Sequence, residues 1–152
     1  MKIIIFLTFL VLGFFLYKNL STPKNIGVQN QKLSPCSWTP NCVNSNATKE
    51  PYKIKPLPCI SEDCLSLIEE FLLNNYKTKV VKKTSTYLYV VVTSPILHFK
   101  DDLEFLIEPG KHSISVRSSS RVGYSDFNVN RKRIESIRHF LNLIKDTQKN
   151  KA

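Results

Sequence analysis

An unbroken apolar run near the N-terminus is the longest hydrophobic pattern of the chain. Residues 3–17 carry no charged side chain, and Lys2 and Lys18 flank them. A helix of this length reaches about 22 Å, so all of residues 1–20 are needed to cross a hydrocarbon core of ~30 Å. No small-residue cleavage site follows Leu20, which favours an uncleaved signal anchor in residues 1–20. A cleaved secretory signal peptide is the alternative.

Two later segments carry apolar side chains at helical spacing. In the first, Leu65, Ile68 and Leu72 recur at steps of three and four residues, which predicts a helix over residues 62–75 with Ser61 as its N-cap. The second segment predicts a helix over residues 130–146. Its apolar stripe consists of Ile134, Ile137, Leu141 and Ile144.

Four β-strands are predicted between these helices, from β-propensity and two-residue alternation. They cover residues 79–84, 87–93, 103–108 and 112–118. Pro109-Gly110 marks a turn between the last two strands. This order of elements predicts an α+β fold: a four-stranded antiparallel sheet, flanked by an N-terminal and a C-terminal helix and preceded by the hydrophobic N-terminal anchor.

The last two strands can be aligned by their apolar faces, because a slip of one residue buries acidic side chains instead. The expected pairs are Leu103–Val116, Phe105–Ile114, Asp102–Arg117 and Glu104–Ser115.

The rest of the chain divides by composition. Residues 21–34 are expected to be a linker, residues 35–146 a single domain with an irregular lead-in up to about residue 58, and residues 147–152 a disordered tail.

Positive charge is the main compositional bias, with 22 Lys and Arg against 12 Asp and Glu and a formal net charge of +10. This balance favours a membrane surface, a nucleic acid or an acidic ligand as partner. The export signal and the lack of a basic, aromatic stacking platform argue against nucleic acid. We expect the chain to contact a membrane through residues 3–17. The chain is then expected to be a single-pass membrane protein with its domain on the extracytoplasmic or lumenal side. If the signal is cleaved, the domain is secreted instead.

Four cysteines support export, because an even count behind a signal is typical of disulfides. Three connectivities are possible, of which we favour the local pairs Cys36–Cys42 and Cys59–Cys64. The gaps of five and four residues fit structural zinc poorly. No metal and no cofactor is expected.

The most informative segment, residues 116–133, joins the last predicted strand to the last helix through a polar loop. The helix begins with Arg131, Lys132 and Arg133, at the end of the helix dipole that disfavours cations, so an anion is expected nearby. The candidate ligand-binding residues are Arg117, Ser118, Ser120, Arg121, Ser125, Asp126, Asn130 and Arg131. Two hypotheses remain open: an anion pocket, or an internal web of ion pairs in which Asp101, Asp102 and Glu104 neutralise the arginines.

Catalytic patterns fit this segment poorly, because a serine nucleophile needs a base and an orienting group. His98 and the acids of residues 101–104 are the candidates for a hydrolase. Strand alternation turns Asp101 away from Asp102 and Glu104, which argues against a hard metal there.

Three blocks of the sequence resemble the domain-of-unknown-function family numbered 1499. They are Pro-Cys-Ser-Trp-Thr-Pro-Asn-Cys-Val-Asn-Ser at residues 35–45, Phe-Lys-Asp-Asp-Leu-Glu-Phe at residues 99–105, and the Arg-Ser-Ser-Ser-Arg-Val-Gly-Tyr-Ser-Asp segment with its following Asn-Arg-Lys-Arg, at residues 117–133. Ser119 stands where the family pattern has alanine, Asn128 where it has glycine, and Cys59 and Cys64 are additions. The resemblance implies an exported or organelle-lumen domain, often membrane-tethered, without an established activity.

The sequence therefore predicts a membrane-tethered or exported domain that binds a small anionic ligand, a lipid headgroup or a partner at this Arg/Ser/Asp segment. An enzyme, hydrolase-like and using the same segment, is the less favoured alternative.

Overall fold

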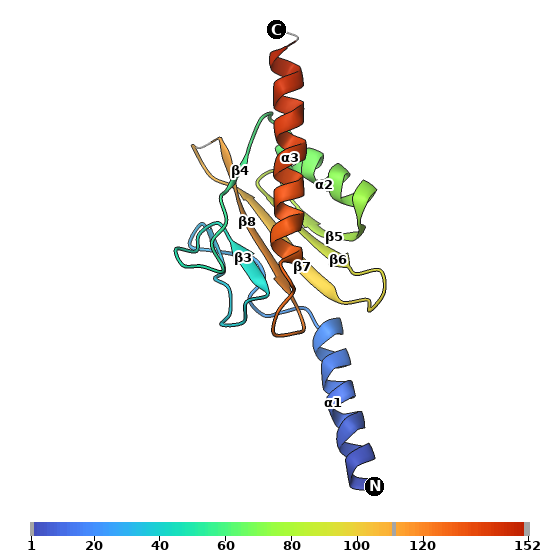
Figure 1. Ribbon diagram of the computed structural model, residues 1–152. Helices are drawn as coiled ribbons and strands as arrows, with labels where there is room; N and C mark the ends of the chain where they lie inside the picture. Colours follow the sequence, from blue (N-terminus) through green and yellow to red (C-terminus); the bar gives the residue numbers. More distant parts are fainter. Residues whose placement is uncertain (1, 111, 151–152) are drawn as a thin grey trace.

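One antiparallel sheet organises the domain in the computed structural model, which describes residues 2–110 and 112–150 (Figure 1). Its strand order is β3-β8-β7-β6-β5, and β4 also pairs with β8. The strands are β3 (Cys42–Asn44), β4 (Leu57–Pro58), β5 (Lys77–Lys83), β6 (Tyr87–Thr93), β7 (Lys100–Ile107) and β8 (Ser113–Ser120). The α+β class is confirmed, but the predicted number of four strands was wrong, because β3 and β4 also belong to the sheet. At three and two residues, β3 and β4 are too short to show an alternating pattern.

In the described part of the chain, three helices complete the fold: α1 (Lys2–Leu20), α2 (Cys64–Asn75) and α3 (Val129–Lys149). The helix after Ser61 begins at Cys64, which is joined to Cys59. The Ser61 hydroxyl is buried and has no hydrogen-bond partner among the described residues, so it does not cap the helix as predicted. The last helix continues to Lys149, past the predicted start of a disordered tail at residue 147. Residues 151–152 of that predicted tail lie outside the described residues.

The register between β7 and β8 differs from the predicted one by two residues. Glu104, not Asp102, lies opposite Arg117, and Phe105 lies opposite Val116. The shift preserves which residues share a face, because side chains alternate with a period of two. The error lies in the turn: the Glu108 amide donates to the Ser113 carbonyl, so the chain reverses its direction one residue later than a turn centred on Pro109-Gly110 would require.

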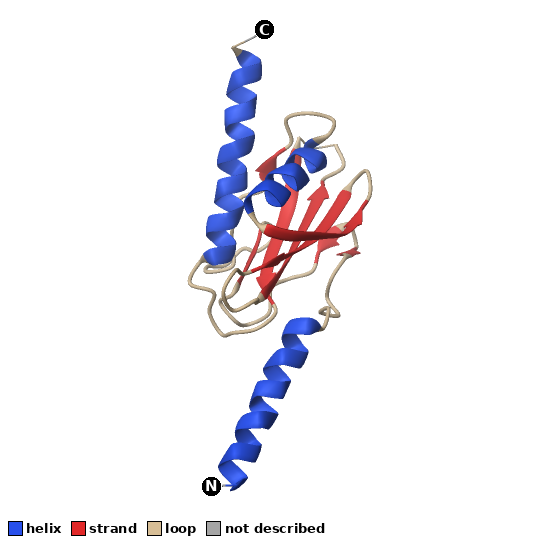
Figure 2. Cartoon of the chain, turned by 90° about the vertical axis from the view of Figure 1, so that its right-hand side faces the viewer, coloured by secondary structure: helices blue, strands red, loops and turns tan. Residues whose placement is uncertain are grey.

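The two faces of the sheet have different covers (Figure 2). Both α2 and α3 pack on one face, over a core whose fully buried side chains include Leu88, Val90, Leu103, Phe105, Ile114, Val116, Ile68, Leu72, Ile134, Ile137 and Leu141. On the opposite face a smaller cluster forms around Leu33, which packs on Tyr87, Tyr89, Val91 and Leu106.

Part of the expected linker covers that opposite face. Within residues 21–34 the chain forms a short antiparallel ribbon of β1 (Val28–Gln29) and β2 (Lys32–Leu33), and Leu33 is buried. Alternate residues of β7 and β8 therefore face either the helices or this ribbon. That division decides where the polar side chains of residues 101–121 lie.

Candidate functional site

Two sets of tyrosine, acid and arginine lie side by side on the ribbon face of the sheet. In the first, Glu104 of β7 accepts a hydrogen bond of 2.9 Å from Arg117 of β8 and one of 2.7 Å from the hydroxyl of Tyr87 of β6. The Gly27 amide of the covering segment donates a third, of 2.6 Å. Glu104 and Arg117 are both buried, so the pair is an internal ion pair with additional donors.

The second set repeats this arrangement around Asp102. Arg121 donates from Nε and from a terminal nitrogen to the two oxygens of Asp102, at 2.9 and 2.7 Å, and the Tyr89 hydroxyl donates at 2.6 Å. Burial raises the pKa of Tyr89 above its usual value, and the hydrogen bond and negative charge of Asp102 raise it further. Burial alone lowers the pKa of Arg121, but its hydrogen bonds and charge interaction with Asp102 outweigh this, so the arginine stays charged.

Arg121 also joins the sheet to the end of α1. Its other terminal nitrogen lies 3.3 Å from the backbone carbonyls of Asn19 and Leu20, at the negative end of the helix dipole. The Asn19 side chain donates to the carbonyl of His98 and accepts from the amide of Lys100, at 3.0 and 2.9 Å. The last turn of the apolar helix is thus held by the ends of β7 and β8.

A separate polar network lies on the helix face, centred on Asn130 of α3. The buried amide accepts from the hydroxyl of Ser118 and donates to the hydroxyl of Ser120 and the carbonyl of Asn41. Ser120 in turn donates to Asp101, which pairs with Arg133 at 2.8 Å. This network fixes the start of α3 against β7, β8 and the segment before β3.

The structure distributes the predicted site residues over several places. Arg117 and Arg121 share the ribbon face with Glu104 and Asp102, whereas Ser118, Ser120, Asn130 and Asp101 share the helix face. Of the remaining three, the Asp126 carboxylate accepts a hydrogen bond from the backbone N–H of Asn130 and so caps the first turn of α3. The Ser125 hydroxyl accepts one from the backbone N–H of Phe127, within an exposed loop. Arg131 lies apart from both groups. It donates to the carbonyls of Pro51 and Lys53, and lies 3.5 Å from Glu50.

Sequence reasoning missed four residues of these networks: Tyr87, Tyr89, Arg133 and Asn41. The two tyrosines occupy alternate positions of β6, on the same face as Asp102 and Glu104, which is the signal that could have paired them with the acids. Arg133 follows Asn130 by three residues, one helical turn. No signal in the sequence points to Asn41.

A cleft of about 390 Å³ opens where α1 meets the end of β8, and we call it the α1–β8 cleft. Its wall consists of Tyr17, Lys18, Ser21, Thr22, Pro23, Lys24, Asn25, Ser37, Thr39, Asn41, Arg117, Ser119, Ser120, Arg121 and Gly123. Four of these side chains are cationic and none is acidic. Within the described chain, Lys18 and Lys24 have no ion-pair partner and are exposed, and the Nε of Arg117 is buried without a hydrogen-bond partner.

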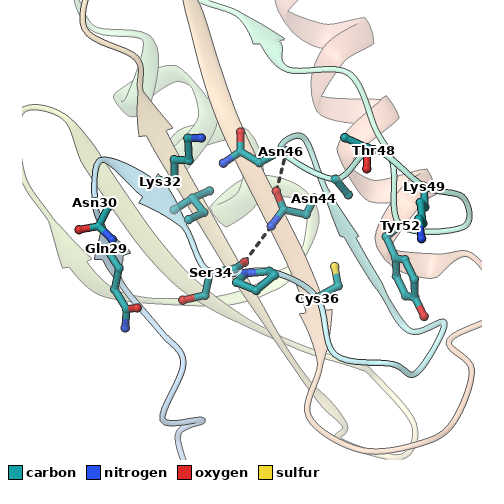
Figure 3. A pocket seen from close by; sticks show the side chains of 13 residues that line it. Gln29, Asn30, Lys32, Ser34, Cys36, Asn44, Asn46, Thr48, Lys49 and Tyr52 are labelled. Carbon is teal, nitrogen blue, oxygen red and sulfur yellow. Dashed lines mark hydrogen bonds between the residues drawn. The ribbon is translucent and has the colours of Figure 1, made fainter.

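Another cleft, of about 640 Å³, lies between the β1–β2 ribbon and the loop after β3 (Figure 3). Its central side chain, Asn44, is fully engaged in internal contacts. The amide donates to the Ser34 carbonyl and accepts from the Asn46 amide, both at 2.8 Å. These contacts tie the ribbon to β3, and the cleft contains none of the ligand-binding residues predicted from the sequence.

The cysteines form the two local disulfides, Cys36–Cys42 and Cys59–Cys64, with Cα–Cα distances of 5.8 and 5.5 Å. Among the described residues no group of three or more His, Cys, Asp or Glu side chains is placed to hold a metal ion. By length and composition, residues Ile3–Leu20 can cross a membrane, and a signal sequence meets the same criteria.

A family model described as a protein of unknown function, DUF1499, matches residues 32–141. The chain belongs to this family. No curated protein and no solved structure matches it. The family match contains both tyrosine–acid–arginine sets and the Asn130 network, and it leaves α1 and β1 outside. Asn128, where the resemblance leads us to expect glycine, has a φ of 64°, a left-handed conformation that glycine and asparagine adopt most readily.

Proposed function

We propose that this chain is a membrane-tethered, non-catalytic domain that holds an anionic phosphate group of a lipid headgroup in the α1–β8 cleft. The observation that carries the proposal is the cleft wall, which has four cations and no carboxylate and adjoins the last turn of an apolar helix. Lysine ammonium groups, serine and threonine hydroxyls and amide groups are the donors that phosphate oxygens accept from.

A retained anchor explains the contacts of α1 better than a cleaved signal peptide does. Nearly all side chains of α1 are exposed, as expected of a helix that lipid surrounds, but Asn19 is buried against the domain. Cleavage after residue 20 removes the carbonyls that Arg121 contacts and the amide that bridges His98 and Lys100. Two disulfides favour an oxidising, extracytoplasmic or lumenal compartment for the domain.

The lysines, rather than the arginines, supply the net charge of the cleft. Arg117 and Arg121 are neutralised by Glu104 and Asp102 behind them, whereas Lys18 and Lys24 are unpaired within the described chain. Near an anionic membrane surface, each such cation contributes about 1 kcal/mol of attraction. The arginines therefore shape the wall, and the lysines attract the ligand.

The hydrolase hypothesis gains no support from the geometry. Ser118 and Ser120 donate their hydroxyl hydrogens to Asn130 and Asp101, not to a histidine base. In this region His98 contacts α1 through its backbone carbonyl, which accepts a hydrogen bond from the Asn19 side chain. We therefore retain the binding function alone.

Ligand binding is testable with the detergent-solubilised full chain and soluble short-chain lipids. We expect dihexanoyl phosphatidic acid to raise the melting temperature, since a ligand at a hundred times its Kd stabilises by about 2.7 kcal/mol. Dihexanoyl phosphatidylcholine is the zwitterionic comparison. The Lys18→Ala/Lys24→Ala variant should lose the shift, whereas Lys145→Ala/Lys149→Ala, which removes two exposed lysines of α3, should keep it.

Inorganic phosphate distinguishes the two sources of this chemistry. A shift with phosphatidic acid but not with phosphate supports a lipid headgroup, whereas equal shifts assign the cleft to a free phosphate compound. An unchanged melting temperature with both, or an equal shift in the Lys18→Ala/Lys24→Ala variant, contradicts the proposal. Tethering is measured separately. Retention of the protein in the membrane after alkaline carbonate extraction tests membrane insertion, and the intact mass tests whether residues 1–20 are retained.

A further inference from the structure

Large apolar side chains are exposed on three loops at one end of the domain. The β6–β7 loop exposes Ile96 and Leu97, with Ile96 84 % exposed. The loop between β8 and α3 exposes Tyr124 and Phe127, and Phe127 is also 84 % exposed. Trp38, in the loop closed by the first disulfide, is 78 % exposed. Apolar side chains gathered in this way mark an interaction surface.

Contacts place all three loops beside the end of α1. The Asn19 side chain bridges His98 and Lys100 at the end of the β6–β7 loop. Ser37 and Thr39, on either side of Trp38, line the same cleft as Tyr17 of α1. The rings of Trp38 and Tyr124 lie 5.8 Å apart, which joins the disulfide loop to the β8–α3 loop. Figures 1 and 2 agree in showing the β6–β7 and β8–α3 loops at the end of the domain where α1 leaves it.

The backbone of the β8–α3 loop holds Phe127 outward in an unfavourable conformation. Phe127 and Asn128 have φ values of 52° and 64°, in the left-handed region that a bulky side chain such as that of Phe127 disfavours. Ser125 and Asp126 hold this conformation by accepting hydrogen bonds from the amides of Phe127 and Asn128. A loop that is fixed with an exposed phenylalanine at its tip is prepared for an apolar partner.

We propose that these three loops insert their apolar tips into the interfacial layer of the bilayer that α1 crosses, so that the domain lies on the membrane instead of standing away from it. This inference rests on the tethering part of the proposed function. The occupant is the bilayer because α1 emerges between the loops and is fixed to them by Asn19 and Arg121, so the membrane that surrounds α1 adjoins the tips. Aromatic side chains are favoured at this depth, and Lys18, Lys24 and the aromatic tips together match an interfacial belt.

Trp38 makes the inference directly measurable, because it is the chain's single tryptophan. The full chain is reconstituted into phosphatidylcholine vesicles with and without lipids brominated near the headgroup. We expect brominated lipid to quench Trp38 emission by at least half, and the emission maximum to lie at shorter wavelength than that of a tryptophan in water. The matched control is Trp38→Phe/Leu143→Trp, with the new tryptophan at an exposed position of α3, which should not be quenched.

A second variant tests the tips themselves. Leu97→Asp/Phe127→Asp places carboxylates on two exposed side chains, so we expect it to keep the melting temperature but to reduce the quenching of Trp38 at least twofold. Unquenched Trp38 emission in a protein that stays in the membrane after carbonate extraction overturns the inference and leaves tethering intact. Loss of the protein from the membrane overturns the tethering proposal, and this inference with it.

Discussion

Arg121 holds both carboxylate oxygens of Asp102, with hydrogen bonds of 2.9 and 2.7 Å from two of its nitrogens, and reaches the last carbonyls of α1 with the third. One guanidinium therefore connects β7, β8 and the apolar helix. Because the side chains of Arg121 and Asp102 are 4 % and 1 % exposed, removing either partner leaves a buried charge without compensation.

Arg121→Ala should lower the free energy of unfolding by about 3–5 kcal/mol, because Asp102 then remains buried and unpaired. The measurement is urea denaturation of the full chain in mild detergent, followed by near-ultraviolet circular dichroism. Arg131→Ala is the control, since Arg131 lies near the surface and its loss should cost under about 1 kcal/mol.

Hydrogen exchange at residues 19–25 should also become faster in the Arg121→Ala variant. A double variant, Asp102→Leu/Arg121→Met, tests whether the two residues are coupled. Its loss of stability should be smaller, by about 1–3 kcal/mol, than the sum of the losses in the single variants Asp102→Leu and Arg121→Met. Additive losses would show that the pair is not coupled.

Asn130→Ala should cost about 2–3 kcal/mol, because the buried amide serves the hydroxyls of Ser118 and Ser120 and the carbonyl of Asn41 together. The same urea series measures the change. Asn142→Ala, on an exposed position of the same helix, should change stability by less than about 0.5 kcal/mol. Equal effects of the two substitutions would contradict a structural role for the Asn130 network.

Stability should fall as the pH rises above about 10. Burial, followed by the hydrogen bonds to Glu104 and Asp102, raises the pKa of Tyr87 and Tyr89 in the folded chain, whereas an unfolded tyrosine has a pKa of about 10. Above that pH the unfolded chain loses protons that the folded chain keeps, so unfolding becomes more favourable. The contribution is therefore fully present below pH 10.

Each of the two tyrosines should lower the free energy of unfolding by about 1.4 kcal/mol per pH unit above pH 10. Urea denaturation at pH 9, 10 and 11 measures this slope. Tyr89→Phe should make it shallower, because one of the two groups no longer titrates, whereas Tyr124→Phe, at an exposed ring, should leave it unchanged. Equal slopes in the parent chain and Tyr89→Phe would contradict the prediction.

Replacing Cys36 and Cys42 together by alanine should cost about 2 kcal/mol, the loop-closure entropy of a short cross-linked loop. The substitution also frees the loop that carries Trp38, so Trp38 fluorescence anisotropy should fall. The pair Cys59 and Cys64 encloses a loop of similar length and should cost a similar amount, without changing the Trp38 signal. An unchanged anisotropy in the first variant would show that the disulfide does not order this loop.

The strong patterns of the sequence predicted most of the fold. Residues 87–93 have high β-propensity throughout, with little alternation of apolar and polar side chains, and they form β6 with the predicted bounds. The stripe of α2 faces the core as its spacing indicates, and so do Ile134, Ile137 and Leu141 of α3, whereas Ile144 is half-buried and lies outside the core cluster. The short strands β3 and β4 escaped prediction because their pairing with β8 is non-local and two or three residues carry no period.

The candidate site was harder to predict because neighbours on a strand face opposite ways. Alternation correctly separated Asp101 from Asp102, which pair with Arg133 and Arg121 on opposite faces. The same rule separates Arg117 from Ser118, and Ser120 from Arg121. Residues that are consecutive in the sequence, and that suggested a single site, therefore lie on opposite faces of the sheet. Which acid meets which arginine depended on a turn length that the sequence did not specify.

In the membrane-tethered arrangement that we propose, the contacts of Asn19 and Arg121 remove a hinge from the point where the chain leaves the bilayer. A domain joined in this way inherits the tilt of its helix, so that a change in bilayer thickness, which alters that tilt, reorients α3 as well. With 21 residues, α3 is about 31 Å long and runs toward the end of the domain opposite α1 (Figure 1). Small rotations at the membrane therefore become displacements of several ångströms at the far tip of that helix.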